Sequence, residues 1–350
     1  MVKKIKAIIV FFILVFLFVS TLRYIVRLPS YTIQTSGKLY IVNKLSRDIT
    51  VFDLFTGTVL YKIPIAVESH NATTLSNQSS VIATNYGTTE IKGKSLTVIN
   101  TENNTVKKTI AFAAGYKGLD GIVAFPKSNR VCVVSSISNE LLVINIDTET
   151  VEKKIATQQK MSHHVVLHPF KSIAYVTNIN SNSVSVIDLD LGSVIKIIKC
   201  KNGTHAIDIT PDGSEIWVAN TTDNVINIIS TATDHVVHTL KSGNEPLGLK
   251  FSNNGKYCLV ANARDGTISV FNQKSKSKIK TIPIRGKKTT IERLLYHTPR
   301  PVSIVMHSNG LYAFVANSNA NKIEVVDMKT FAIVSTIGTG KIPDGLALVK

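Results

Sequence analysis

A unit of about 42 residues that repeats along the chain constrains the fold more than any other feature. One copy spans residues 174–213 and reads AYVTNINSNSVSVIDLDLGSVIKIIKCKNGTHAIDITPDG. Its first two runs, Ala174–Asn178 and Val184–Asp188, are rich in β-branched residues, and the second alternates apolar and polar residues. Two more short runs follow, and the last one ends at the turn Pro211-Asp212-Gly213. The unit therefore predicts four antiparallel strands joined by tight turns.

Seven copies of this unit are present. The second strand of each copy ends at Asn43, Asn85, Ser135, Asn178, Asn220, Asn262 and Asn317. Four-stranded repeats of about 40–45 residues are the sequence sign of a β-propeller. We therefore predict an all-β, seven-bladed β-propeller over residues 38–350. The chain enters it on the second strand of a blade and ends on a segment, 344–349, that matches the first strand, so the C-terminal strand is expected to close the first blade.

The motifs AYVTN, VSVID and HAIDITPDG resemble the YVTN-type β-propeller repeat family. That family is found in surface-layer-like and periplasmic propeller proteins of bacteria and archaea, and the resemblance extends over residues 38–350. It implies the propeller fold. For function it implies less, because the family includes binding proteins as well as distant relatives of lactonases and oxidoreductases.

The first 25 residues read as a signal peptide or membrane anchor. Lys3, Lys4 and Lys6 precede an apolar run over residues 7–22. Basic residues before an apolar segment predict a cytoplasmic N-terminus, so the propeller is expected outside the membrane. Phe18 occupies a position where a cleavage site needs a small residue, which favours an uncleaved anchor over a secreted or periplasmic protein. Residues 26–37 are predicted to be a polar linker.

Charge and cysteine content limit the partners. The formal net charge is +17, and removing the basic opening segment leaves about +12 on the propeller, which favours anionic partners. The three cysteines form no CxxCH motif, which argues against covalently attached haem. No cofactor is required by the sequence, and we expect a monomeric propeller.

Alignment of six of the turns, with Asp344 added by its match to the same strand motif, predicts which residue begins each innermost strand and so lies at the mouth of the central channel. The polar members of this set are predicted ligand-binding residues: Asn71, Asp120, His163, His205 and Asp344. Leu247 and Val302 complete the ring, and His70 and His164 are secondary candidates. Carboxylates and imidazoles suit a cation or a small polar substrate. We assign no metal, because side chains of neighbouring sheets begin up to about 10 Å apart. A channel that is simply lined with polar side chains and filled with water is the structural alternative.

A basic segment before the last blade is a second candidate site. Its cations are Lys274, Lys276, Lys278, Lys280, Arg285, Lys287 and Lys288. We expect an exposed ribbon or loop beside the mouth that binds an anionic polymer or protein with salt-dependent affinity. A solvated run of charges is the structural alternative. Nucleic acid is less favoured, though not excluded, because Tyr296 is nearly the only aromatic residue among these charges.

The sequence favours a binding or scaffold module over an enzyme. No GxSxG, HExxH or nucleotide-binding fingerprint occurs in a fitting context. The predicted function is therefore to hold a protein, an envelope polymer or a small ligand at the mouth. Two alternatives stay open. One is a lactonase-like hydrolase with Asp120, His163, His205 and Asp344 around a metal or a water, and the other is a cofactor-linked enzyme with a mouth histidine as axial ligand.

Overall fold

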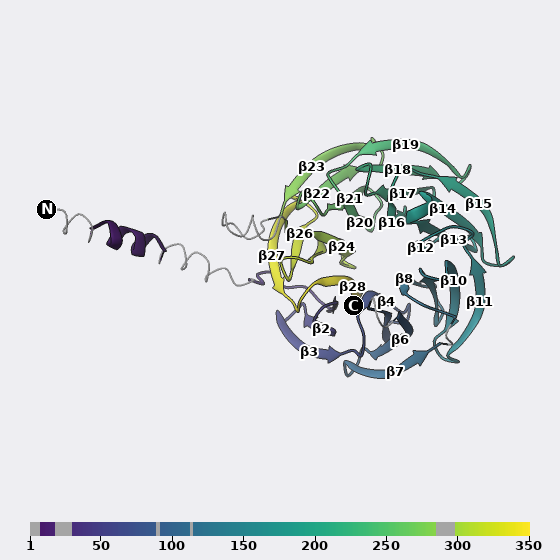
Figure 1. Cartoon of the computed structure of the whole chain (residues 1–350), viewed down its shortest axis with the longest axis horizontal. Coiled ribbons are helices and arrows are strands. Elements are labelled where there is room, and N and C mark those ends of the chain that lie inside the picture. Colours follow the sequence, from purple (N-terminus) through teal and green to yellow (C-terminus); the bar gives the residue numbers. More distant parts are fainter. Residues whose placement is uncertain (1–7, 18–29, 89–91, 113–114, 285–297) are drawn as a thin grey trace.

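The computed structural model describes residues 8–17, 30–88, 92–112, 115–284 and 298–350. Within these ranges the chain forms seven four-stranded sheets. Figure 1 shows the sheets arranged around a common axis as the blades of a propeller. The predicted all-β seven-bladed propeller is confirmed.

Each strand occupies one of four positions from the axis outward (Figure 1). The innermost strands are β4 (Ser69–Thr74), β8 (Leu119–Ala124), β12 (Ser162–Leu167), β16 (Thr204–Ile209), β20 (Pro246–Phe251), β24 (Pro301–Met306) and β28 (Pro343–Val349). The second strands are β1 (Lys38–Asn43), β5 (Ser80–Gly87), β9 (Arg130–Ser135), β13 (Ile173–Asn178), β17 (Glu215–Asn220), β21 (Tyr257–Asn262) and β25 (Tyr312–Asn317). The third strands are β2 (Asp48–Asp53), β6 (Lys92–Asn100), β10 (Glu140–Asn145), β14 (Ser183–Asp188), β18 (Val225–Ser230), β22 (Thr267–Asn272) and β26 (Lys322–Asp327). The outermost strands are β3 (Thr58–Pro64), β7 (Thr105–Ala111), β11 (Thr150–Ala156), β15 (Ser193–Lys199), β19 (His235–Lys241), β23 (Ser277–Pro283) and β27 (Ala332–Gly338).

Blade 1 combines the two ends of the propeller. Its strand order is β28-β1-β2-β3, and blades 2 to 7 take the other strands in groups of four along the chain. Leu39 of β1 lies opposite Leu348 of β28, and Ile41 lies opposite Leu346. Blade 1 is thus built from both ends of the propeller segment, and the C-terminus lies near the axis (Figure 1).

The core consists of the faces that neighbouring blades press against each other. Second and third strands are buried on both faces, so their sequences are nearly continuous apolar runs. The side chains of the outermost strands are mostly exposed to solvent. Trp217 of blade 5 is fully buried, and its ring centroid lies 5.3 Å from Phe251 and 6.0 Å from Phe271, both of blade 6. Burial of such faces stabilises the ring, since each large side chain contributes about 1.5–3 kcal/mol.

The asparagine that ends most second strands is structural. Asn178 is fully buried and its Nδ2 donates a 2.9 Å hydrogen bond to Ser185 Oγ on the third strand of its blade. Asn262 makes the same 2.9 Å bond to Ser269 Oγ. A buried amide needs such a partner, which explains why Asn and a Ser or Thr recur seven residues apart. These residues hold each blade together and do not belong to the ligand site.

One predicted loop is in fact mainly a strand. Lys274 and Lys276 lie at the turn between β22 and β23, and Lys278 and Lys280 belong to β23. Lys278 and Lys280 thus lie on an exposed strand, which is the ribbon form of the prediction, but this strand is the outermost of blade 6 and does not lie beside the mouth. Lysines on an exposed outer strand also discourage edge-to-edge association. Arg285, Lys287 and Lys288 lie outside the described residues.

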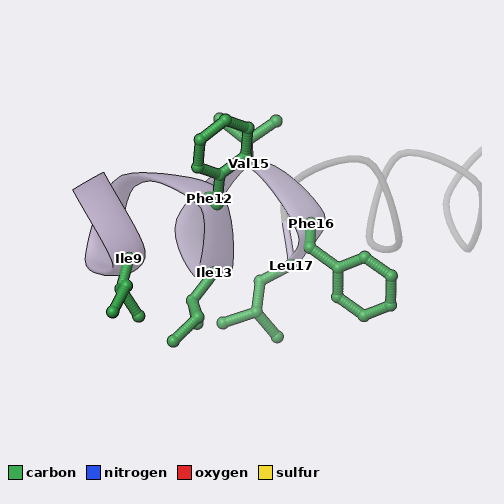
Figure 2. Close-up of a pocket in the computed structure, with 6 residues that line it drawn as sticks. All are labelled: Ile9, Phe12, Ile13, Val15, Phe16 and Leu17. Carbon is green, nitrogen blue, oxygen red and sulfur yellow. The ribbon is translucent and has the colours of Figure 1, made fainter. Parts of the chain in front are cut away.

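The N-terminal part of the chain contains a short helix over residues 8–17. Its apolar side chains, among them Ile9, Phe12 and Phe16, extend outward on several sides (Figure 2). Among the described residues, no helix has both the length and the apolar character that a membrane span needs. Residues 1–7 and 18–29, which hold the rest of the predicted anchor, lie outside the described part of the chain.

The end of the predicted linker is attached to the propeller. The hydroxyl of Tyr31 donates a 2.7 Å hydrogen bond to the carbonyl of Leu54, and its ring packs edge-on against Phe52 at 5.0 Å. The backbone N–H of Thr336 in β27 donates to the carbonyl of Ser30 at 3.0 Å. Residues 30 onward therefore pack on blades 7 and 1.

Candidate functional site

A cavity of about 750 Å³ runs along the propeller axis. Its lining includes the first residues of the innermost strands and also later ones, such as Thr74, Met306 and Leu348. We call the face at which the innermost strands begin the mouth face. All five predicted ligand-binding residues and both secondary candidates line this cavity.

Seven residues occupy the same position, the second residue of each innermost strand. In ring order from blade 1 they are Asp344, His70, Asp120, His163, His205, Leu247 and Val302. We call the first five the polar arc and the last two the apolar arc. The strand order and the place in the strand are the same in all seven blades, so the main difference between the arcs is side-chain chemistry.

The prediction of Asn71 for this position in blade 2 was wrong by one residue. Ser69 pairs with Asn85 as Ser162 pairs with Asn178, which makes His70 the equivalent of His163. The true equivalent of Pro211 in blade 2 is Ser76, but Asn77 beside it is an equally good turn residue, and matching Asn77 shifted the alignment by one. Asn71 still belongs to the site through its contact with Asp120.

A β-bulge brings two adjacent residues of each innermost strand to the cavity. Successive side chains of a regular strand point to opposite faces. In β12 the register shifts between Ser162 and Val165, and the other innermost strands shift at the corresponding place. A bulge re-aims side chains in this way. As a result, His163 and His164 both line the cavity.

Asp120 is the centre of the hydrogen-bond network. Its Oδ1 accepts a 2.8 Å hydrogen bond from Asn71 Nδ2, and its Oδ2 lies 3.1 Å from His163 Nε2 and 3.7 Å from His70 Nδ1. Burial alone raises the pKa of Asp120, but His163 and His70 outweigh burial and hold the pKa well below its usual value. Asp120 is therefore an ionised carboxylate that orients two imidazoles.

Three histidine rings lie in contact beside Asp120. The ring centroid of His163 lies 4.3 Å from that of His164 and 4.3 Å from that of His205, and the last two are 5.3 Å apart. Burial lowers the pKa of His163, yet Asp120 raises it further, so the net pKa is raised. Burial, helped by the charge of His163, lowers the pKa of His164 to about 3 and that of His205 well below its usual value.

Several ring nitrogens of this cluster have no hydrogen-bond partner among the described residues. They are buried and comprise His163 Nδ1, His205 Nδ1 and His70 Nε2. His70 is also held by stacking on Tyr86, with centroids 4.0 Å apart and planes 13° from parallel. Buried polar atoms normally have a partner, so this group is unusual. Its nitrogens are available to a ligand.

Asp344 and Lys44 complete the mouth. Both line the cavity, and among the described residues neither carries a side-chain hydrogen bond or ion pair to the other groups of the site. Burial raises the pKa of Asp344 although His70 and Lys44 counteract it. Sequence reasoning missed Lys44 because it follows a second strand, where the repeat gives no signal for the cavity.

The class of protein is a seven-bladed propeller with a histidine-lined axial cavity. The model of the Cytochrome D1 heme domain family matches residues 168–348, just over half of the chain. The chain belongs to this family. The matched segment includes His205 but not His163, His164 or Asp120, so most of the cluster lies outside it. The YVTN-type repeat stays a resemblance.

Solved structures support the fold. Hydrazine synthase of Kuenenia stuttgartiensis is 16% identical with a TM-score of 0.70, and the match covers 80% of this chain and 89% of that one. A functionally unknown protein from Desulfotomaculum acetoxidans is 18% identical with a TM-score of 0.73, covering 89% of this chain and 99% of that one. A search of curated proteins finds no match. At these identities the likeness concerns fold alone.

Proposed function

We propose that this chain is a binding protein whose axial cavity takes a small anionic ligand at the mouth face. The observation that carries the proposal is the cavity of about 750 Å³ lined by the polar arc. Small-molecule sites usually measure about 300–1,000 Å³ and contain a few converging polar groups. The apolar arc and the inner valines and isoleucines supply the rest of the lining.

Charge at the mouth favours an anion. Asp120 lies 3.1 Å from His163, so its negative charge is offset within the site. Arg300 also lines the cavity, but it is paired with Glu245 at 2.9 Å. Lys44 has no ion-pair partner among the described residues, and Lys350 also lines the cavity. The carboxylate that opposes them is Asp344, whose pKa is raised by burial, which weakens its negative charge. The positive net charge of the whole chain also favours the approach of anions.

The group named in the family description is haem, and the histidine cluster does not fit it. A tetrapyrrole takes four coplanar positions on its iron and leaves two, on opposite sides. His163, His164 and His205 lie together, with centroids 4.3–5.3 Å apart, so at most one of them would reach the iron from one side. A haem would therefore use one histidine and leave the other two without a role, although the Nδ1 atoms of His163 and His205 are both buried without a partner among the described residues. The three-histidine arrangement as a set supports a ligand other than haem.

The anionic ligand can be tested with citrate as the probe. We expect citrate to bind the full chain by calorimetry, and Lys44→Gln to weaken binding at least about tenfold because the cation at the mouth is lost. Lys199→Gln is the matched control, since Lys199 is exposed on the outermost strand β15. Equal citrate affinity in both variants, or no binding at all, would refute the anionic ligand.

A hydrolase is the second candidate, and Asp120 favours it. A carboxylate that orients a buried imidazole is the arrangement of a general base. In this chain the partners are Asp120 and His163, with Asp344 across the cavity. The test is hydrolysis of a lactone. If the wild type hydrolyses it and His163→Gln does not, the protein is a hydrolase and the binding role is wrong.

We further propose that the N-terminal segment carries the protein across the cytoplasmic membrane and anchors it there. The side chains of residues 8–17 are between 39% and 72% exposed, which leaves an apolar surface for lipid. The basic residues before it set the orientation. Cell fractionation and external protease treatment test this: the account expects a membrane-bound, protease-accessible propeller, and a soluble cytoplasmic protein contradicts it.

The lysines of the outermost strand β23 support an anionic polymer as a further partner. Lys278 and Lys280 belong to β23, and Lys280 contacts the carbonyl of Thr330 at 3.0 Å. Lys276 is less available, because it pairs with Glu215. A partner held by such charges would be released as salt rises. Retention of heparin at high salt would argue against this surface.

A further inference from the structure

We propose that His163, His164 and His205 bind one divalent transition-metal ion at the mouth end of the axial cavity. The inference deepens the proposed function and rests on it in one respect, that the axial cavity is the binding site. Imidazole nitrogens suit Zn²⁺, Co²⁺, Ni²⁺, Cu²⁺ and Fe²⁺, whereas Ca²⁺ and Mg²⁺ prefer oxygen. The ion therefore belongs to the first transition row.

The donor atoms already lie close together. One ligand atom from each of the three histidines can be chosen so that all lie within 4.8 Å of one another. In a tetrahedral zinc site, with metal–nitrogen bonds of about 2.0–2.1 Å, the donors are about 3.3 Å apart. The donors that are furthest apart would therefore have to approach by up to about 1.5 Å to share one ion.

A β-bulge in the innermost strand brings these donors together. His163 and His164 are adjacent and would point to opposite faces of a regular strand. The bulge after Ser162 turns both toward the cavity, and His205 comes from the same region of the next blade. Three nitrogens therefore reach one point from two neighbouring blades.

The second layer of contacts also matches a metal site. His163 donates through Nε2 to Asp120, which leaves the lone pair of Nδ1 free, and that atom is buried without a partner. The Nδ1 of His205 is likewise buried without a partner among the described residues. Ligating histidines usually hold a carboxylate or carbonyl with their other nitrogen. Asp120 is thus a positioning residue.

The fold itself does not require imidazoles at these places. Leu247 and Val302 occupy the same position as His163 and His205 in blades 6 and 7. A propeller with apolar side chains there would have no unpaired ring nitrogens. The cluster is better explained by a ligand that uses the nitrogens than by packing.

Three protein ligands leave at least one coordination position for another molecule. Structural zinc sites have four protein ligands, whereas sites with three keep an open position. Within the described lining, that position faces the cavity that Asp344 and Lys44 also line. The ion would hold the donor oxygen of an anionic ligand, and Lys44 would contact its remaining charge.

Cobalt titration tests the site in the full-length chain in detergent. After removal of metal with a chelator, Co²⁺ is added and the visible bands of tetrahedral cobalt are followed. We expect one equivalent to bind, with affinity at least tenfold lower in His164→Gln and in His205→Gln. His238→Gln, on the exposed strand β19, is the matched control and should bind like the wild type. Asp120→Asn should weaken binding by about 10–100-fold while keeping the cobalt spectrum.

The possible outcomes distinguish a failure of the metal site from a failure of the cavity as a binding site. Circular dichroism of each metal-free variant shows whether it is folded, and glutamine substitutions keep side-chain volume. Absence of cobalt bands in folded wild type, or equal affinity in His205→Gln and His238→Gln, overturns the metal site. If citrate still binds in that case, the proposed function stands without the metal. If haemin gives an absorption shift that His164→Gln abolishes and cobalt does not bind, the three-histidine ion is wrong.

Discussion

The polar arc and the apolar arc occupy one ring of equivalent positions, yet only one of them gathers ionisable groups. Asp120, His163 and His205 are placed by the same strand, bulge and pairing that place Leu247 and Val302. The propeller scaffold therefore tolerates either chemistry at the mouth. The fold does not require ionisable groups at these positions, which is the ground on which we propose a ligand.

The largest expected effect comes from opening the ring, on which both arcs depend. Deleting residues 344–350 removes Asp344 and the strand that pairs with β1, including the buried Leu346 and Val349. Loss of this burial and of the strand hydrogen bonds should cost about 5 kcal/mol or more. Thermal unfolding followed by circular dichroism measures it, with deletion of Lys350 alone as control. An unchanged melting temperature would mean that the two chain ends do not hold the ring together.

The next effect tests whether the two arcs share one backbone. A Cβ on Gly121 would lie 2.3 Å from the carbonyl oxygen of His163, and one on Gly248 would lie 2.4 Å from that of Val302. Both backbone atoms are fixed, so Gly121→Ala and Gly248→Ala should each destabilise the propeller by about 2 kcal/mol. Gly115→Ala, with open space around it, should be neutral. If denaturant unfolding shows a lower free energy of unfolding for only one of the two variants, the blades of the two arcs are not packed in the same way.

Exchanging chemistry between the arcs gives a smaller change in stability and a large one in binding. His205→Leu copies Leu247 into the polar arc and removes the unpaired Nδ1. The metal-free variant should therefore match the wild type or exceed it by about 1 kcal/mol, while cobalt binding is lost. Melting curves and cobalt titration are the readouts. Destabilisation by more than about 2 kcal/mol would indicate that His205 is needed for packing instead.

The smallest effect concerns a buried carboxylate that lies in an apolar-arc blade and outside the cavity. Glu324 stands where blade 4 has Ser185, seven residues after the asparagine that ends the second strand of its blade, Asn317, and it is 1% exposed. Within the described part of the chain its Oε2 and the Oδ1 of Asn317 have no partner, although Lys322 lies 2.7 Å from Oε1. Burial raises the pKa of Glu324 above its usual value, and Lys322 only partly offsets this.

The sign of the pH effect follows from that raised pKa. The protonated form is favoured in the folded state, so its stabilising contribution is complete at low pH and is lost as pH rises through the folded-state pKa. Glu324→Thr should remove this loss and gain about 1 kcal/mol near neutral pH. Melting temperatures between about pH 5 and pH 8 test it. A variant that keeps the wild-type slope shows that Glu324 is not its source.

Much of the fold was predictable because each blade repeats its own signals. The Asn at the end of the second strand and the turn after the first predict seven blades, and both features have structural partners inside each blade. Prediction failed where a local signal was missing. In blade 2 the two turn residues Ser76 and Asn77 could not be told apart, which moved the mouth position from His70 to Asn71. The strand character of Lys278 and Lys280 was hidden by their charge.

The site was predictable in membership but not in geometry. Asp120, His163 and His205 follow from the alignment of the blades. The contribution of His164 depends on a bulge, and simple alternation would place it opposite His163. Lys44 reaches the mouth from the end of β1, where no repeat position indicates it. Contacts between blades depend on backbone irregularities that residue patterns do not encode.

The most direct test of the account is anomalous diffraction from crystals of the full-length chain grown with Zn²⁺. The account predicts one strong peak about 2 Å from a ring nitrogen of each of His163, His164 and His205, with none beside Leu247 and Val302. An empty cluster, or a zinc peak elsewhere in the cavity with the three imidazoles unliganded, would contradict it.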